Sequence, residues 1–357
     1  MNSILIVNTF GIGDVLFTTP VISNLHRAYP QARIVYLANR RTAEFLKHNP
    51  KIHKVLVYER DEFHAVYRRN PLAFALKWRA LVEEIKAERF DAVFNFFLNR
   101  TFVSICWLAG VPMRVGYDFR GRGQFLTHRY PLVRYEGRHV VEYYLDLLRR
   151  QDIPVHDTSL EMPLSAGDDE WAAQWLKSHS IAGHPLLVAM VPGGGASWGK
   201  HAQNKRWPAA QYAQLADKVV ADLGAAVILI GDAKEEALCQ EIARLAHHPF
   251  YSAVGQTSVT QMAALFKRCR LAIANDGGPL HVAVAVKTPT IGIFGPVDDA
   301  VYGPYPPAGH EVVKLGIACQ PCYRNFYVND CSHSKCLQEL SVEDVYKKVE
   351  RKVHAKL

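Results

Sequence analysis

The feature that most constrains this chain is an alternation of strand-like and helix-like segments that occurs twice along the sequence. Short apolar runs rich in β-branched residues alternate with longer segments in which apolar residues recur at helical spacing. The expected strands are 3–10, 32–38, 54–58 and 91–97 in the first half, and 185–191, 225–230, 271–274 and 289–294 in the second. Because such alternation builds β–α–β units, the sequence predicts an α/β protein with parallel sheets.

Residues 151–170 separate the two alternations and are rich in turn-forming and polar residues. We therefore expect a first Rossmann-like domain over 1–160 and a second over 161–340. A final helix is expected over 341–357, with Ser341 as its N-cap. The other expected helices are 15–29, 42–48 and 72–87 in the first half, and 209–223, 234–246, 259–269 and 279–286 in the second.

The charge is distributed unevenly along the chain. The 357 residues are 49% hydrophobic, enough to fill two cores, and carry a formal charge of +8. Residues 1–160 hold 23 Lys and Arg against 15 Asp and Glu, whereas residues 161–357 hold 19 of each. A basic excess suits nucleic acid, an anionic membrane face or a phosphorylated molecule, so composition alone does not choose among them.

No apolar run approaches the roughly 18–20 residues that span a bilayer. The first residues, Met1-Asn2-Ser3, lack the basic start of a signal peptide, and the apolar run after them is short. These observations predict a cytoplasmic protein.

A glycine-rich turn follows the first expected strand. Gly11 and Gly13 let the backbone pass close to a ligand, and Asp14 puts a carboxylate at the start of the next helix. Ligands of open parallel sheets bind beyond the carboxyl ends of the strands, where this turn is expected. A tight turn with Asp14 as a simple N-cap explains the same residues equally well.

The turn lacks the full dinucleotide fingerprint. Leu16 stands where a third glycine is expected, and Asn39-Arg40-Arg41 replaces the acidic residue that usually ends the second strand. These differences exclude an ordinary NAD site. The two arginines would suit the extra phosphate of NADP, so an NADP-dependent oxidoreductase stays an alternative.

A second glycine-rich turn follows the strand expected over 185–191. Gly193, Gly194 and Gly195 present successive backbone N–H groups, which favour an anion. Lys205 is expected near the start of the next helix, where it would add a full positive charge for a pyrophosphate. A flexible surface loop is the alternative, and the absence of Gly-Lys-Ser/Thr excludes a Walker A loop.

A third turn follows the strand expected over 271–274 and contains Asp276, Gly277 and Gly278, with His281 shortly after. The start of the next helix offers free N–H groups and a partial positive charge. Singly, Asp276 would be an N-cap and His281 a core histidine. Their combination with two glycines indicates a site for a sugar or a phosphate.

Together these segments resemble glycosyltransferase family 9, the heptosyltransferases of lipopolysaccharide core synthesis. The matches run in the family's order over nearly the whole chain, and residues 60–150 carry the fewest of them. They are 4–7 with Gly11-x-Gly13-Asp14, Pro192-Gly193-Gly194 with Lys205-Arg206-Trp207-Pro208, 275–281, 289–296, and Cys319-Gln320-Pro321-Cys322. The resemblance implies a GT-B fold, in which two Rossmann-like domains with parallel sheets face a central cleft and the final helix packs back on the first.

The resemblance also implies an inverting transfer of heptose from ADP-L-glycero-D-manno-heptose that requires no metal or other cofactor for catalysis. Asp14 would be the catalytic base, because an acceptor hydroxyl has a pKa far above 7 and must lose its proton as the bond forms. The departing diphosphate needs positive charge. The implied donor-binding residues are Gly193, Gly194, Gly195, Lys205, Glu235, Asp276, Gly277, Gly278 and His281. Among them Glu235 would hold the ribose hydroxyls, unless it is an ordinary first-turn acid of a helix.

The implied acceptor is the inner core of lipopolysaccharide, either lipid A–Kdo or a heptosylated core. This phosphorylated glycolipid lies on an anionic membrane, so the basic first half would face it at the cytoplasmic side of the inner membrane. The candidate acceptor residues are Gly11, Gly13, Arg60, Arg68, Arg69, Arg100 and Arg120, with Arg114 and Arg122 beside them. We expect no nucleic-acid partner, because the basic half has no RNA-binding or helix-turn-helix motif and its arginines are dispersed.

Two departures from better-known members affect the donor. Residues 196–204 form an insertion that lengthens the donor-side loop, and Gly277 replaces a hydroxyl residue that some members carry. A related glycosyltransferase with another nucleotide sugar therefore stays an alternative.

Four cysteines cluster near the C-terminus: Cys319, Cys322, Cys331 and Cys336. Four thiolates at such spacings could hold structural zinc or iron. Loop thiols that pack near the final helix are the alternative, and the one favoured by a single Cys-x-x-Cys pair.

Overall fold

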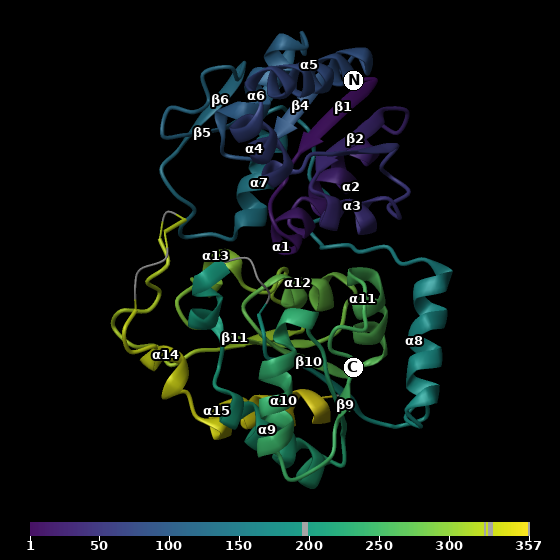
Figure 1. The fold of residues 1–357 in the computed structure, drawn as a ribbon, viewed down its shortest axis with the longest axis vertical. Coiled ribbons are helices and arrows are strands. Elements are labelled where there is room, and N and C mark those ends of the chain that lie inside the picture. Colours follow the sequence, from purple (N-terminus) through teal and green to yellow (C-terminus); the bar gives the residue numbers. More distant parts are fainter. Residues whose placement is uncertain (195–198, 325, 328–330, 356–357) are drawn as a thin grey trace. The chain divides into compact units, whose positions relative to one another are not determined.

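The computed structural model describes residues 1–194, 199–324, 326–327 and 331–355. The chain divides into two compact units, Met1–Thr158 and Ser159–Leu357. Each unit contains one six-stranded parallel sheet with helices around it, as Figure 1 shows. The expected α/β class with two parallel sheets is confirmed.

Unit 1 contains six strands in the order β3-β2-β1-β4-β5-β6. The strands are β1 (Ser3–Val7), β2 (Arg33–Ala38), β3 (Lys54–Val57), β4 (Ala92–Asn95), β5 (Met113–Phe119) and β6 (His128–Leu132). The helices are α1 (Ile12–Leu16), α2 (Thr19–Ala28), α3 (Arg40–Leu46), α4 (Arg60–Arg69), α5 (Pro71–Ala87), α6 (Arg100–Leu108) and α7 (Val140–Arg149). The strand order reverses between β1 and β4, the point at which such sheets bind ligands.

Unit 2 repeats this order as β9-β8-β7-β10-β11-β12. Its strands are β7 (Leu187–Val191), β8 (Ala226–Leu229), β9 (Tyr251–Ser252), β10 (Leu271–Asn275), β11 (Thr290–Ile293) and β12 (His310–Val313). Its α-helices are α8 (Ala166–Ser178), α9 (Ala209–Leu223), α10 (Glu236–Leu245), α11 (Val259–Arg268), α12 (Gly278–Ala285), α13 (Asp299–Tyr302), α14 (Lys335–Gln338) and α15 (Val342–His354). Two 3-10 segments, η1 (Gly199–Lys205) and η2 (Ala233–Glu235), follow β7 and β8. Here the order reverses between β7 and β10.

The central strands are buried on both faces. Every residue of β1, β4, β7, β8, β10 and β11 is buried, which is why each reads as a continuous apolar run rather than an alternating one. In unit 2 the final helix α15 packs against α9 and adds Val345 and Val349 to the core around Trp207. Packing of this helix on the first domain stays a prediction.

The structure corrects two expected elements. The single helix expected over 15–29 is divided into α1 and α2, because the hydroxyls of Thr18 and Thr19 bind the last carbonyls of α1 and Pro20 cannot donate a backbone hydrogen bond. Helix α8 begins inside the expected linker, where Ser165 and Asp168 form a capping box. No helix among the described residues combines the length and apolar character needed to cross a membrane.

Candidate active site

Asn275, at the end of β10, ties together two segments of unit 2 that follow β7. Its side-chain Nδ2 donates to the carbonyl of Pro192 at 2.6 Å, and its Oδ1 accepts from the backbone N–H of Trp207 at 3.2 Å. Asn275 is fully buried, so both bonds are shielded from water. The glycine-rich turn, the end of the 199–205 segment and the β10–α12 turn are thereby held at the switch point between β7 and β10.

Glu235 packs directly against the first glycine of the turn. A Cβ atom on Gly193 would lie 1.8 Å from Glu235 Oε1, so only glycine fits there beside this carboxylate. Glu235 is 4% exposed, and its Oε2 accepts from the N–H of Asp232 at 3.0 Å, so it also caps η2. Arg206 donates from Nε to the carbonyl of Gly193 at 3.0 Å and holds Nη2 3.8 Å from Glu235 Oε1.

A buried ion pair lies at the same place. Lys205 Nζ is 2.6 Å from Asp276 Oδ2, with the two residues 8% and 4% exposed. Two charges are seldom buried together unless they are paired, because removing each from water is costly. The structure therefore brings together two of the expected donor-binding residues from segments 71 positions apart.

Gly277 leaves no room for a side chain. A Cβ atom there would lie 2.0 Å from the carbonyl oxygen of Gly194, so the hydroxyl residue of some family members would not fit beside this turn. Gly194 adopts a left-handed conformation (φ 72°), which favours glycine. Gly278 is the first residue of α12, and Gly195 lies outside the described residues.

His281 lies in α12 and is 3% exposed. Burial lowers the pKa of His281 to about 3, with smaller contributions from the positive charges of Lys205 and His310. Its imidazole is therefore neutral at physiological pH, and it lies within electrostatic reach of the Lys205–Asp276 pair.

In unit 1, two asparagines hold the turn that carries Asp14. Asn8 donates to the carbonyl of Asp14 at 3.0 Å and accepts from the N–H of Phe10 at 3.1 Å. Asn39 donates to the carbonyls of Thr9 and Phe10, and it also caps α3. The turn is therefore fixed by side chains from the carboxyl ends of β1 and β2.

Asp14 is the third residue of α1 rather than its N-cap, which is Gly11. A Cβ atom on Gly11 would lie 3.5 Å from Asp14 Oδ2, so the carboxylate lies over this glycine. Burial raises the pKa values of Tyr36 and Tyr135, and the negative charge of Asp14 raises both further. Asp14 therefore lies within electrostatic reach of two buried phenols, one from β2 and one from the segment after β6.

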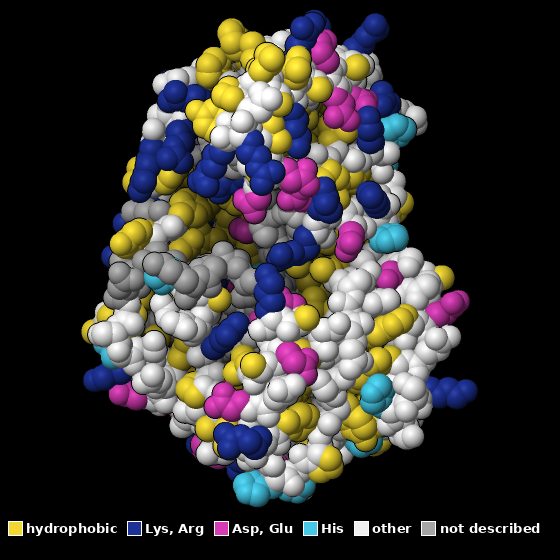
Figure 2. Space-filling view, viewed as in Figure 1, with side chains coloured by type: hydrophobic (Ala, Val, Ile, Leu, Met, Phe, Trp, Pro, Cys, Tyr) yellow, Lys and Arg dark blue, Asp and Glu magenta, His cyan; other side chains and the backbone are white. Residues whose placement is uncertain are grey.

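The structure places the five candidate acceptor arginines of unit 1 in two groups. Arg60, Arg100 and Arg120 are exposed and follow the carboxyl ends of β3, β4 and β5. Asp14 follows the carboxyl end of β1 in the same sheet. Arg68 and Arg69 are exposed at the end of α4, about 12–14 Å along the helix from Arg60. Figure 2 shows several of the Lys and Arg side chains on the visible face of this unit.

Arg114 differs from the other arginines because it binds backbone. Its Nε donates to the carbonyl of Phe125 at 2.6 Å, and its Nη1 donates to the carbonyl of Val111. Burial lowers the pKa of Arg114. This side chain fixes the β5–β6 connection instead of facing an acceptor, which corrects its place among the candidates.

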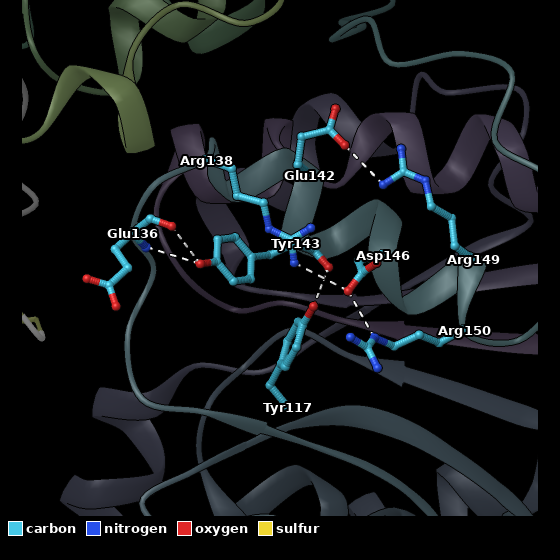
Figure 3. A network of polar contacts seen from close by, with 8 residues as sticks. All are labelled: Tyr117, Glu136, Arg138, Glu142, Tyr143, Asp146, Arg149 and Arg150. Atoms are coloured by element: carbon cyan, nitrogen blue, oxygen red, sulfur yellow. Dashed lines mark hydrogen bonds and ion pairs between the residues drawn. The ribbon is translucent and has the colours of Figure 1, made fainter.

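A polar network anchors the segment between β6 and α7. Figure 3 shows Asp146 between the guanidinium groups of Arg138 and Arg150, at 3.3 and 2.9 Å. Burial would raise the pKa of Asp146, but the two arginines outweigh it and hold this pKa below its usual value. Tyr143 donates to the carbonyl of Glu136 at 2.8 Å. These contacts fix the segment that carries Tyr135.

Comparison with known proteins identifies the family. The sequence profile of glycosyltransferase family 9 (heptosyltransferase) matches residues 78–333, well over half of the chain. This chain belongs to glycosyltransferase family 9. The family 9 enzyme is 26% identical over 303 residues to lipopolysaccharide heptosyltransferase 3 of Escherichia coli K12, and the match covers 82% of each chain.

Two solved structures share its fold. A family 9 glycosyltransferase from Veillonella parvula has a TM-score of 0.80 and 23% identity, over 99% of this chain and 97% of that one. An ADP-heptose lipopolysaccharide heptosyltransferase II of E. coli has a TM-score of 0.75 and 22% identity, over 99% and 98%. The expected GT-B fold, two Rossmann-like domains in one chain, is therefore confirmed.

The four cysteines of this family 9 glycosyltransferase lie near one another without forming a metal centre. Cys322, Cys331 and Cys336 line one cavity, and Cys319 is exposed. Burial raises the pKa of the Cys336 thiol to about 11, with a smaller contribution from the other three sulfurs. Among the described residues, no group of three or more His, Cys, Asp or Glu side chains is arranged to hold a metal ion. The residues as placed do not fit zinc or iron.

Sequence reasoning missed the residues that position the site. Asn8, Asn39 and Asn275 act through hydrogen bonds to backbone groups, and Arg206 reaches both Gly193 and Glu235. Position is the only signal that could have found them, because each one directly ends a strand or adjoins Lys205. Arg40, one of the two arginines suggested for an NADP phosphate, pairs with Glu62 at 2.6 Å.

Proposed function

We propose that this enzyme transfers heptose from ADP-L-glycero-D-manno-heptose to the inner core of lipopolysaccharide, with lipid A–Kdo or a heptosylated core as acceptor. The observation that carries the proposal is the buried Lys205–Asp276 pair beside Gly193 and Glu235 at the β7–β10 switch point. The E. coli structure with the same fold is named for ADP-heptose and lipopolysaccharide, which supports the same donor and acceptor here. The reaction would occur at the cytoplasmic face of the inner membrane.

On the donor side, Lys205 would neutralise the diphosphate as it departs. Backbone N–H groups of the Gly193–Gly195 turn and of Gly277-Gly278 would add hydrogen bonds at the start of α12. Glu235 would accept hydrogen bonds from the ribose hydroxyls, because its Oε1 faces the glycine turn while its Oε2 is bound to Asp232. Asp276 and His281 would contact the sugar.

On the acceptor side, Asp14 would be the general base. The acceptor oxygen would attack C1 of the heptose as the bond from C1 to the diphosphate oxygen breaks, and the hydroxyl proton would pass to Asp14. A single displacement of this kind inverts the anomeric centre, and one base is sufficient for it. The positive charge that stabilises the departing diphosphate would come from Lys205 and backbone N–H groups. A chelator should therefore leave the rate unchanged.

The exposed arginines would bind the anionic groups of the acceptor. Arg60, Arg100 and Arg120 follow β3, β4 and β5 at the carboxyl end of the sheet, where Gly11, Gly13 and Asp14 follow β1, so they could contact phosphate and carboxylate groups of one extended glycolipid. Arg68 and Arg69 stay proposed acceptor residues, placed further along α4.

A panel of nucleotide sugars tests the donor. We expect ADP-heptose to raise the unfolding temperature of the enzyme, with UDP-, GDP- and CMP-sugars inactive at the same concentration. Selective stabilisation by a UDP-sugar would overturn the donor and favour a related glycosyltransferase.

The catalytic base is tested by Asp14→Asn. We expect loss of at least 100-fold in kcat with unchanged donor binding, because general-base catalysis contributes about 10²- to 10⁴-fold. Asp222→Asn, which changes an exposed acid on α9, is the matched control and should keep full activity. Turnover by the Asp14 variant near that of the control would eliminate the proposed role.

A further inference from the structure

The corner between α4 and α5 exposes large apolar side chains. Tyr67 is 57% exposed, Leu72 71% and Leu76 60%, in a protein whose other helices bury most residues of this kind. Figure 2 shows hydrophobic side chains gathered at the top of unit 1, over the region that Figure 1 labels α5 and α6, with Lys and Arg side chains beside them. We define the α4–α5 corner as residues 67–79.

These apolar side chains are not the inner face of α5. The inner face is formed by Phe74, Trp78, Leu81 and Ile85, which pack on the core of unit 1. Leu72 and Leu76 are four residues apart, so they project together from the opposite side of the helix. Helix α5 therefore has two apolar faces, and the core of unit 1 uses one of them.

The charge around the outer face is mostly positive. Residues 63–82 contain four basic residues and no Asp or Glu: Arg68, Arg69, Lys77 and Arg79. Of the acids that flank this stretch, Glu62 is bound by Arg40 at 2.6 Å and lies 3.4 Å from Lys77, and Glu83 lies one turn after Arg79 on α5. Burial of a leucine pair beside an excess of cations, among them Arg68 and Arg69, suits a surface that is apolar inside and anionic outside, as an anionic bilayer is.

The corner is also held in place. The side chain of Asn70 accepts from the N–H of Ala73 at 3.0 Å and caps α5, and the ring of Tyr67 packs edge-on against Phe74 at 5.2 Å. The exposed leucines therefore stand on a fixed support, so little ordering would oppose their insertion into a bilayer.

We propose that the α4–α5 corner docks unit 1 on an anionic lipid bilayer, with Leu72 and Leu76 inserted between headgroups and Arg68, Arg69 and Arg79 on lipid phosphates. The proposal rests on the proposed function, because the acyl chains of the acceptor lie in such a bilayer. Helix α4 starts at Arg60 on the site edge and is about 15 Å long, so docking at its far end would keep the site within reach of a membrane-held sugar.

Binding to acceptor-free vesicles tests this surface. We expect the full chain to cosediment with phosphatidylglycerol–phosphatidylethanolamine vesicles and not with phosphatidylcholine vesicles. Leu72→Ser/Leu76→Ser should weaken binding at least tenfold. Arg68→Gln/Arg69→Gln should weaken it about 30-fold, since each basic residue near such a surface contributes roughly a fivefold factor. High salt should remove most of the difference that the arginines make.

Leu245→Ser and Arg244→Gln supply matched controls, because both positions are exposed on α10 in unit 2. We expect both controls to bind vesicles as the wild type does. Equal binding by the corner variants would overturn the proposal. So would a wild-type dimer that the leucine variant converts to monomer in ultracentrifugation while vesicle binding is kept, because the occupant would then be a second copy of the chain.

Activity on an acceptor without acyl chains separates this inference from the proposed function. We expect Leu72→Ser/Leu76→Ser to keep wild-type turnover on that acceptor and to lose turnover on vesicle-embedded acceptor. If the wild type turns over the soluble acceptor and binds no anionic vesicles, the docking surface is wrong and the function stands. If it binds vesicles through the corner and turns over neither acceptor, the function is wrong and the surface stands.

Discussion

Lys205 and Asp276 form a 2.6 Å ion pair that joins the end of η1 to the β10–α12 turn, and both residues are more than nine-tenths buried. Desolvation of two charges costs several kcal/mol each, and their mutual attraction offsets this only when the geometry is good. The pair therefore keeps a positive charge at the carboxyl end of the central strands, where an unpaired buried lysine would be unfavourable. A diphosphate that enters this site offers the same lysine a second anionic partner.

We expect Lys205→Ala to raise the donor Kd about 10- to 100-fold, because a charge-assisted hydrogen bond contributes about 1.5–3 kcal/mol. The KM of the acceptor should change less than threefold. Calorimetric titration with ADP-heptose and a steady-state acceptor series would measure the two. Equal effects on donor and acceptor would remove Lys205 from the donor site.

The variant also leaves Asp276 buried without its cation, at a cost of about 3–5 kcal/mol in the free energy of unfolding. Lys205→Met/Asp276→Leu is the control for this effect, since it removes both charges. We expect the double variant to regain most of the stability and none of the donor affinity. Recovery of donor binding would show that the single variant acted through folding alone.

Gly193→Ala tests the contact between the glycine turn and Glu235. The new Cβ would overlap Oε1 of Glu235, so the carboxylate would have to leave its position. We expect a loss of about 1–3 kcal/mol in stability and at least tenfold weaker donor binding. Gly183→Ala is the control, because a Cβ at that exposed glycine meets no atom within 4 Å. Wild-type donor affinity in Gly193→Ala would contradict the assigned contact.

The sequence was sufficient to predict the central strands, because strands that are buried on both faces have continuous apolar sequences. It was not sufficient for β5 and β6, which contain Arg114, Asp118 and Pro131 and lie toward the edge of the sheet. Pro131 cannot donate a ladder hydrogen bond, so β6 resembles a loop in sequence.

The residues of the candidate site likewise include some that the sequence could predict and some that it could not. Gly193, Lys205 and Asp276 could be found from glycine-rich turns after apolar strands, because that spacing has a local physical cause. The role of Asn275 could not be found, since its bond to Pro192 spans 83 positions and leaves no local pattern. The close approach of Gly277 to Gly194 is likewise a tertiary contact.

Substitution of the arginines that follow the strand ends should weaken acceptor binding and leave donor binding unchanged. We expect Arg100→Ala and Arg120→Ala each to raise the acceptor KM about 5- to 30-fold, since each removes charge-assisted hydrogen bonds. The donor Kd should stay unchanged in both. Arg129→Ala, at an exposed arginine within β6, should behave as the wild type in the same assay. An acceptor KM unaffected by both variants would exclude this edge as the acceptor surface.

His281 should make unit 2 less stable in mild acid. Its pKa is about 3 in the folded chain, against 6.5 for an ordinary histidine. Between these values the unfolded chain binds a proton that the folded chain does not, so the free energy of unfolding falls as pH falls from about 6.5 toward 3. By pH 5 this histidine alone accounts for a loss of about 2 kcal/mol relative to neutral pH.

Urea denaturation at pH 7 and pH 5 measures that loss. We expect His281→Gln to reduce the drop between the two pH values by about 2 kcal/mol, whatever its stability at pH 7, because glutamine does not titrate. His354→Gln, which changes an exposed histidine at the end of α15, should show the full wild-type drop. A wild-type drop in His281→Gln would mean that this imidazole is already protonated in the folded protein at pH 5, and so is not held neutral beside Lys205.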